Sequence, residues 1–142
     1  MSDAVEYAGF ARRIWSADPY NLAAIRFEVH RWLQALPMTE DVVGDVVLAV
    51  NEAATNSIEH AYRPLTEQST VELMFWVDDD VVHIAISDHG RWRPRPAHPG
   101  GRGNGITLML RLVESVVIDH DAGGTRVLLR HPLTDEPALA TG

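Results

Sequence analysis

Cysteine is absent from the 142 residues, which excludes disulfide frameworks, thiolate metal sites and cysteine nucleophiles. Basic residues are also few, since 12 Lys and Arg against 20 Asp and Glu give a formal net charge of −8. Without a basic surface the phosphates of DNA or RNA are poorly held, so we expect no direct nucleic-acid partner. No apolar run approaches the roughly 18 residues that span a bilayer, so we expect no membrane partner and a cytoplasmic protein.

The composition that remains is that of a folded domain. Hydrophobic residues make up 46% of the chain and charged residues 23%, and the length suits a single core. We therefore expect one domain over residues 1–133. Residues 134–142 contain little to bury, which indicates a flexible tail or linker.

The spacing of apolar residues predicts the elements in the order β-α-α-β-β-α-β-β. Because hairpins supply most of the strands, the fold class is α+β, a two-layer sandwich with a mostly antiparallel mixed sheet and three helices on one face. The predicted strands are 5–15, 69–77, 82–88, 116–118 and 125–131, the predicted helices are 20–36, 39–62 and 104–113, and a long loop covers 89–103.

The strongest local signal is the run from Gly100 to Gly105, which has four glycines in six positions directly before an apolar helix. Backbone N–H groups free of side chains can converge on an anion there, and the positive end of the helix adds to the attraction. The run predicts a phosphate cradle. It is no P-loop, because Ile106 stands where the lysine is needed, and a flexible hinge is the alternative.

Asp88 ends the strand row Val82, Ile84, Ile86, so alternation places its carboxylate on the face that points into the core. A charge there is costly unless a donor meets it, and a ligand amino group would do so. Gly90 would let a flat ring approach the backbone. The alternative is that Asp88 caps its own turn by a local hydrogen bond.

Glu52 and Asn56 lie four residues apart on one face of the second predicted helix. Periodicity favours a solvated face, since most apolar positions lie opposite. The functional alternative is that the pair overhangs a cleft, where the Asn56 amide oxygen binds a hard cation and the Glu52 carboxylate accepts a proton from an attacking hydroxyl.

Two further signals are weak. Thr125 continues the inward parity of Val127 and Leu129, although buried hydroxyls more often satisfy backbone carbonyls than ligands. The seven histidines show no spacing typical of a zinc site, so we expect none.

Four boxes taken in order resemble the GHKL ATPase superfamily: Glu52-Ala-Ala-Thr-Asn56 on a helix, Asp88-His-Gly90 at a strand end, Gly101-Arg-Gly103-Asn-Gly105 before a helix, and Gly124-Thr125 opening a strand. Within it, VLAVNEAATNSIEHAY and GRGNGITLMLRLVESV are similar to the bacterial anti-sigma factor serine/threonine kinases of the RsbW and SpoIIAB type. The similarity covers about residues 8 to 132. It implies a Bergerat-type sandwich that binds ATP and Mg between the helices and the sheet.

The resemblance implies a role for each matching residue. Asn56 would bind magnesium, Glu52 would be the general base, and Asp88 would accept a hydrogen bond from the adenine amino group. Gly90 and Thr125 would line the adenine pocket. The phosphate lid would comprise Gly101, Arg102, Gly103, Asn104 and Gly105.

The resemblance also implies partners. Family members sequester a sigma factor and phosphorylate a STAS-domain anti-anti-sigma factor, and Arg26 falls where the family has a partner-contacting arginine. A homodimer is a further expectation. Trp92 replaces the second glycine of the usual Asp-x-Gly-x-Gly, so the alternative function is a catalytically weak or inactive module that only binds its partner. A sensor histidine kinase would need a phosphoacceptor helical hairpin that these residues lack.

Overall fold

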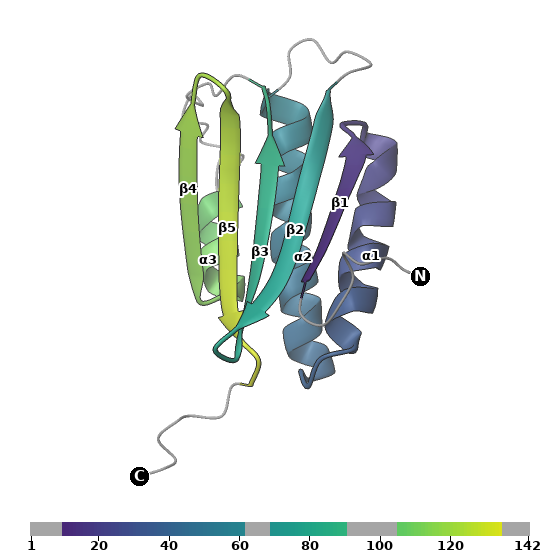
Figure 1. The fold of residues 1–142 in the computed structure, drawn as a ribbon, viewed down its shortest axis with the longest axis vertical. Coiled ribbons are helices and arrows are strands. Elements are labelled where there is room, and N and C mark those ends of the chain that lie inside the picture. The colour runs from purple at the N-terminus through teal and green to yellow at the C-terminus, as the bar shows by residue number, and fades with distance from the viewer. Residues whose placement is uncertain (1–9, 62–68, 91–104, 135–142) are drawn as a thin grey trace.

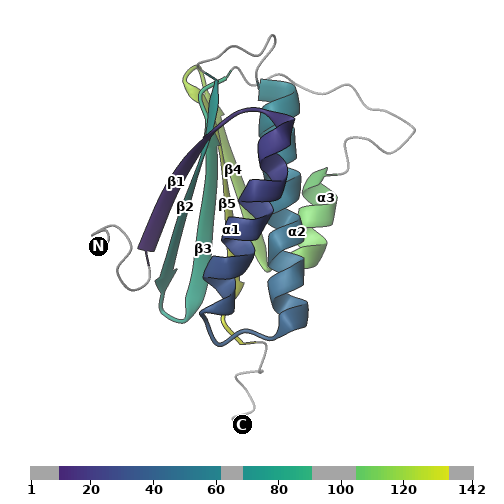
Figure 2. The same ribbon diagram turned by 90° about the vertical axis from the view of Figure 1, so that its right-hand side faces the viewer.

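The computed structural model describes residues 10–61, 69–90 and 105–134. The described strands form one sheet in the order β1-β2-β3-β5-β4, and the α-helices α1, α2 and α3 cover one of its faces (Figures 1 and 2). The element order and the two-layer α+β architecture are as the sequence predicted. Every described strand pairing is antiparallel, so the sheet is more uniform than the mixed sheet expected.

The helix starts follow the capping residues of the sequence. Asp18 accepts a hydrogen bond from the Tyr20 amide at 2.9 Å and begins the short 3₁₀ helix η2 (Pro19–Asn21), which continues as α1 (Leu22–Gln34). Thr39 Oγ1 accepts from the Val42 amide at 3.3 Å and caps α2 (Glu40–Asn56). The second helix was predicted to reach residue 62, but its last part is a π turn, η3 (Ser57–Ala61).

The sheet is built from two hairpins and one N-terminal strand. The first hairpin joins β2 (Thr70–Asp78) to β3 (Val81–Asp88) through Asp79 and Asp80, whose φ angles of 57° and 61° are tolerated by Asp in tight turns. The second joins β4 (Ser115–Asp121) to β5 (Gly124–Pro132). α3 (Gly105–Leu112) connects the two hairpins, and β5 inserts beside β3.

The core lies between the sheet and the helices. Each strand contributes alternate residues and each helix a stripe spaced at three and four, as the apolar pattern predicted. Trp32 of α1 stacks on Phe75 of β2 with 4.6 Å between ring centroids. The largest fully buried side chains include Phe75, Ile25, Leu33, Leu73, Ile84, Ile86, Met109 and Leu129.

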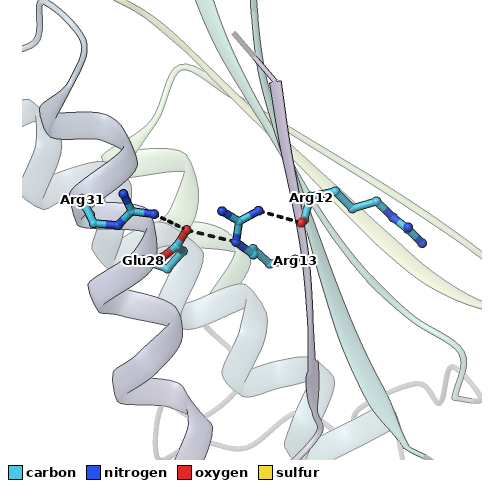
Figure 3. Close-up of polar contacts among 4 residues, drawn as sticks. All are labelled: Arg12, Arg13, Glu28 and Arg31. Carbon is cyan, nitrogen blue, oxygen red and sulfur yellow. Dashed lines mark hydrogen bonds and ion pairs between the residues drawn. The ribbon is translucent and has the colours of Figure 1, made fainter. Parts of the chain in front are cut away.

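A polar network fastens strand β1 (Phe10–Ser16) to the helix layer (Figure 3). The Arg13 guanidinium lies 3.2 Å from the Glu28 carboxylate of α1 and donates to the carbonyl of Arg12 at 2.9 Å. Arg31 approaches the same Glu28 oxygen at 2.8 Å. On the other face of β1, Arg12 pairs with Glu72 of β2.

The ends of the predicted domain are described only in part. Residues 5–9 of the predicted first strand, Trp92 and the tail from 135 lie outside the described residues. Leu133 packs against the core and its amide donates to the Asp80 carbonyl at 2.9 Å. No described helix combines the length and apolarity needed to cross a membrane.

Candidate functional site

Asp88, the last residue of β3, is buried with 4% of its surface exposed. Its Oδ1 accepts hydrogen bonds from the Gly90 amide at 3.1 Å and from the Thr125 amide of β5 at 3.3 Å. The buried Ser57 belongs to η3, which packs against β3, and its side chain lowers the pKa of this carboxyl. Asp88 therefore caps its own turn, as one interpretation held, and also points inward, as the other held.

Burial raises the pKa of the Asp88 carboxyl above its ordinary value. The hydrogen bonds from Ser57, Gly90 and Thr125, and the charge of His89, act in the opposite direction because they favour the ionised form. A ligand N–H directed at this carboxylate would favour ionisation further. The site is thus suited to a ligand that carries a hydrogen-bond donor.

Gly124 lets β5 approach the end of β3 at this point. Its φ is +142°, and a Cβ placed on it would overlap the Asp88 carbonyl oxygen. Only glycine adopts this φ without strain and has no Cβ to overlap the carbonyl oxygen. Gly124 therefore lets the next residue, Thr125, pair in register with Asp88.

Glu52 and Asn56 project from α2 toward the start of α3 and are half-buried. A Cβ placed on Gly105 would lie 2.6 Å from Glu52 Oε2 and 3.0 Å from Asn56 Nδ2. By contrast, Asp45 of the same helix and Glu59 of η3 are exposed. The pair therefore lies against a buried glycine rather than on an open, solvated face.

These two groups of residues form one site because Asn56 and Ser57 are consecutive. Asn56 faces Gly105, and Ser57 begins η3, which packs against β3, the strand that ends at Asp88. The positive end of the α3 dipole begins at Gly105, beside the Glu52 carboxylate. The site thus combines a carboxylate that can accept a proton, an amide oxygen suited to a hard cation and a buried acceptor.

The remaining predicted site residues are Arg26 and four residues of the glycine-rich run. The Gly101, Arg102, Gly103 and Asn104 predictions lie outside the described residues. Arg26 is exposed on α1 and donates to Asn51 Oδ1 at 2.9 Å. Among the described residues no group of three or more His, Cys, Asp or Glu could hold a metal ion.

Sequence reasoning missed Ser57. To predict that Ser57 is buried, one would have to know that a π turn follows Asn56, because that turn determines which side chain meets the sheet. The only signal in the sequence was its position directly after Asn56.

The family model described as histidine kinase-like ATPase domain matches residues 15–131. The chain belongs to this family. The anti-sigma F factor of Clostridium beijerinckii is 32% identical over 123 residues, 78% of this chain and 85% of that protein. The serine-protein kinase RsbW of Bacillus subtilis is 25% identical over 130 residues, 81% of each chain. These relatives confirm the resemblance to anti-sigma factor kinases.

Solved structures support the same fold. The RsbU and RsbW domains of Rv1364c from Mycobacterium tuberculosis align with a TM-score of 0.69 and 23% identity over 87% of this chain. The match spans 32% of that longer chain. The catalytic domain of the histidine kinase ThkA aligns with a TM-score of 0.55 and 10% identity, over 87% of this chain and 97% of that domain. The two-layer fold is therefore that of histidine kinase-like ATPase domains.

Proposed function

We propose that this protein is an anti-sigma factor and an ATP-dependent serine/threonine kinase. It sequesters a sigma factor and phosphorylates a STAS-domain anti-anti-sigma factor. The names of its relatives, anti-sigma F factor and serine-protein kinase RsbW, support both activities. The observation that carries the proposal is the convergence of Glu52 and Asn56 on Gly105, together with the buried Asp88 at the end of β3, the strand against which the turn after Asn56 packs.

The chain's residues fit ATP and Mg²⁺. Asp88 is a buried acceptor next to Gly90, and would receive the adenine amino group, with Thr125 on the neighbouring strand. The Asn56 amide oxygen would hold Mg²⁺, and the start of α3 at Gly105 would face the phosphates. ATP with Mg²⁺ supplies the γ-phosphoryl group and neutralises charge during its transfer.

Glu52 would act as the general base. Its carboxylate lies against the start of α3 rather than in open solvent, so it would accept the proton of the partner's hydroxyl as the oxygen bonds phosphorus and ADP leaves. The lid residues Gly101, Arg102, Gly103 and Asn104 would enclose the phosphates. Arg26, on the exposed side of α1, would contact the protein partner. The proposed partners imply a cytoplasmic location, and a homodimer remains a prediction.

The test is incubation of the protein with labelled ATP, Mg²⁺ and the STAS-domain proteins encoded near its gene. One of them should gain phosphate on serine or threonine, and the protein should also form a complex with a sigma factor. Complex formation without any phosphate transfer would favour the alternative, a module that only binds its partner.

Glu52→Ala is expected to retain ATP binding and to lose phosphotransfer by roughly 10²–10⁴-fold, the range that a general base contributes. Asp45→Ala is the matched control, because Asp45 is an exposed acid on the same helix. Single-turnover transfer rates measure both. Undiminished transfer by Glu52→Ala would remove this residue from the mechanism.

Asn56→Ala is expected to abolish Mg-ATP binding and to leave the fold intact, because it deletes the amide oxygen proposed for the cation. Isothermal calorimetry measures the affinity and circular dichroism the fold. Asn51→Ala serves as the control, since Asn51 is on the same helix but bonds Arg26. Equal ATP affinity in Asn56→Ala and the native protein would refute the cation role.

A further inference from the structure

Arg26 is an exposed arginine of α1 whose charge is not paired with a carboxylate. Its Nη1 donates to the Oδ1 of Asn51 on α2 at 2.9 Å, and no described carboxylate lies within ion-pairing distance of it. Arg31, the other arginine of α1, instead pairs with Glu28 at 2.8 Å. In a chain with a formal net charge of −8, Arg26 therefore presents a positive charge that its surroundings leave uncompensated.

The hydrogen bond to Asn51 holds the guanidinium without cancelling its charge. A free arginine side chain occupies many rotamers, and a partner that binds it has to overcome the entropy lost when these are reduced to one. An amide oxygen accepts from the guanidinium but is neutral, so the remaining N–H donors and the full positive charge stay available. An aspartate in the same place would form an ion pair and compete with an incoming carboxylate. The neutral acceptor is therefore suited to presenting the cation to a partner.

Exposed apolar side chains lie on both helices beside this pair. Phe27, directly after Arg26 on α1, is 69% exposed, and Leu48, one turn before Asn51 on α2, is 46% exposed. Aromatic residues and arginine are enriched in protein interfaces and often dominate their binding energy. These four residues form what we call the α1/α2 surface. It fits a protein segment that carries a carboxylate next to apolar side chains.

The α1/α2 surface lies next to the proposed general base. α2 is placed between α1 and α3 (Figure 2). Asn51 bonds Arg26 of α1, whereas the next residue, Glu52, lies against Gly105 of α3. Consecutive Cα atoms are about 3.8 Å apart, whereas a standard interface covers roughly 800 Å² of each partner. A protein seated on the α1/α2 surface can therefore also reach Glu52, as a phosphoacceptor must and a protein that is only sequestered need not.

We propose that Asn51 is a positioning residue that holds the Arg26 guanidinium as a preformed, uncompensated cation. The cation pairs with a carboxylate of the protein that accepts the phosphoryl group, and apolar side chains of that protein pack on Phe27 and Leu48. The proposal rests on the proposed kinase function. It adds to that function Asn51, two apolar contacts and the chemistry that the phosphoacceptor has to present.

The experiment measures phosphotransfer from ATP as a function of the concentration of the STAS-domain protein that accepts phosphate. Asn51→Ala deletes the acceptor and should raise the KM for that protein about two- to tenfold, the cost of ordering one flexible side chain, with kcat unchanged. Asn51→Asp restores an acceptor but neutralises Arg26, so it should raise this KM as well. A role confined to holding α1 against α2 predicts a native KM in Asn51→Asp, and that result would overturn the proposal.

Two further variants calibrate these changes. Gln34→Ala removes a matched exposed hydrogen bond between the same helices, since Gln34 Nε2 donates to Glu40 Oε2 at 3.2 Å, and it should keep the native KM. Arg26→Ala removes the cation and defines the full increase in KM. A positioning residue acts through the residue that it positions, so adding Asn51→Ala to Arg26→Ala should raise the KM no further. Additive increases would contradict the proposal.

Binding of the sigma factor tests for another occupant of the α1/α2 surface. Calorimetry measures the affinity of the native protein and of Asn51→Ala for the sigma factor with which it forms a complex. If Asn51→Ala weakens this complex but leaves the KM for the STAS-domain protein unchanged, the surface belongs to the sigma factor and the proposal is wrong.

Nitrogen NMR relaxation at Nε of Arg26 in the free protein gives a measurement that needs neither ATP nor a partner. The guanidinium should become more mobile in Asn51→Ala and stay ordered in Asn51→Asp. Unchanged mobility in Asn51→Ala would overturn the positioning role. If mobility rises as expected but the native protein transfers no phosphate, the proposed function fails together with the docking partner, and only the hold of Asn51 on Arg26 stands.

Discussion

At the scale of single residues, the site depends on the missing side chain of Gly105 as much as on the side chains around it. Gly105 has no Cβ, and the space is taken by the ends of Glu52 and Asn56. Real Cβ atoms essentially never approach another atom as closely as 2.6 Å, so a side chain there would have to displace the Glu52 carboxylate. The glycine thus leaves the space in which these two side chain ends lie.

We expect Gly105→Ala to lower phosphotransfer by at least about tenfold, because a displacement of about 1 Å can lower rates by as much as 10²-fold. Transfer rates at saturating ATP measure this loss. Gly44→Ala is the matched control, since a Cβ on Gly44 of α2 meets nothing within 4 Å. That control should keep full transfer and raise the unfolding free energy by about 0.5–1 kcal/mol. Native transfer rates in Gly105→Ala would contradict the placement argument.

At the scale of elements, α2 links the stability of the fold to the site. Its start is fixed by the Thr39 cap and its end carries Glu52 and Asn56. The helix has 17 residues, so the cap lies roughly 25 Å from the end that forms the site. Changes at the cap should therefore affect stability without changing the site.

Thr39→Ala is expected to lower the free energy of unfolding by about 1 kcal/mol, because it leaves the Val42 amide without its side-chain acceptor. Urea denaturation measures the change. Thr39→Ser retains an acceptor at the same place and should stay close to the native value. A marked fall in ATP affinity in Thr39→Ala at temperatures where it is folded would show that the two ends of α2 are coupled.

At the scale of the whole molecule, burial of the Asp88 carboxyl makes the stability of the fold depend on pH. Its pKa is raised in the folded protein above the ordinary 3.8, so the folded state retains a proton that the unfolded chain has already released. Stability therefore falls as pH rises through the interval between these two pKa values, and the loss is complete above the folded-state pKa.

Asp88→Asn should escape this loss, because an amide does not ionise and its oxygen can still accept from Gly90 and Thr125. We expect a higher unfolding free energy than the native protein at pH 7, with a difference that narrows toward pH 4. Denaturation series across this range measure it. Asp45→Asn, at an exposed position, should show no such difference. A less stable Asp88→Asn at pH 7 would mean that ionisation of Asp88 favours the fold.

Much of the fold could be predicted because its causes are local. The Thr39 cap, the alternation in β2 and β3 and the turn at Asp79 and Asp80 each act within a few residues, and the structure has all of them. The end of α2 was predicted six residues too far. Helical periodicity continues past Asn56, but η3 packs on β3 and β5 and takes the wider π geometry, which no local signal encodes.

The sequence by itself determined the elements, their order and the membership of Glu52, Asn56, Asp88 and Thr125 in four recognisable boxes. Only the tertiary structure decided between the alternatives left open for the surroundings of Glu52 and of Asp88. Whether Glu52 is solvated or faces Gly105, and whether Asp88 has a donor besides its own turn, depends on residues far apart in the chain. The physical reason is that periodicity fixes which face a side chain occupies, whereas burial and hydrogen bonding depend on what packs against that face.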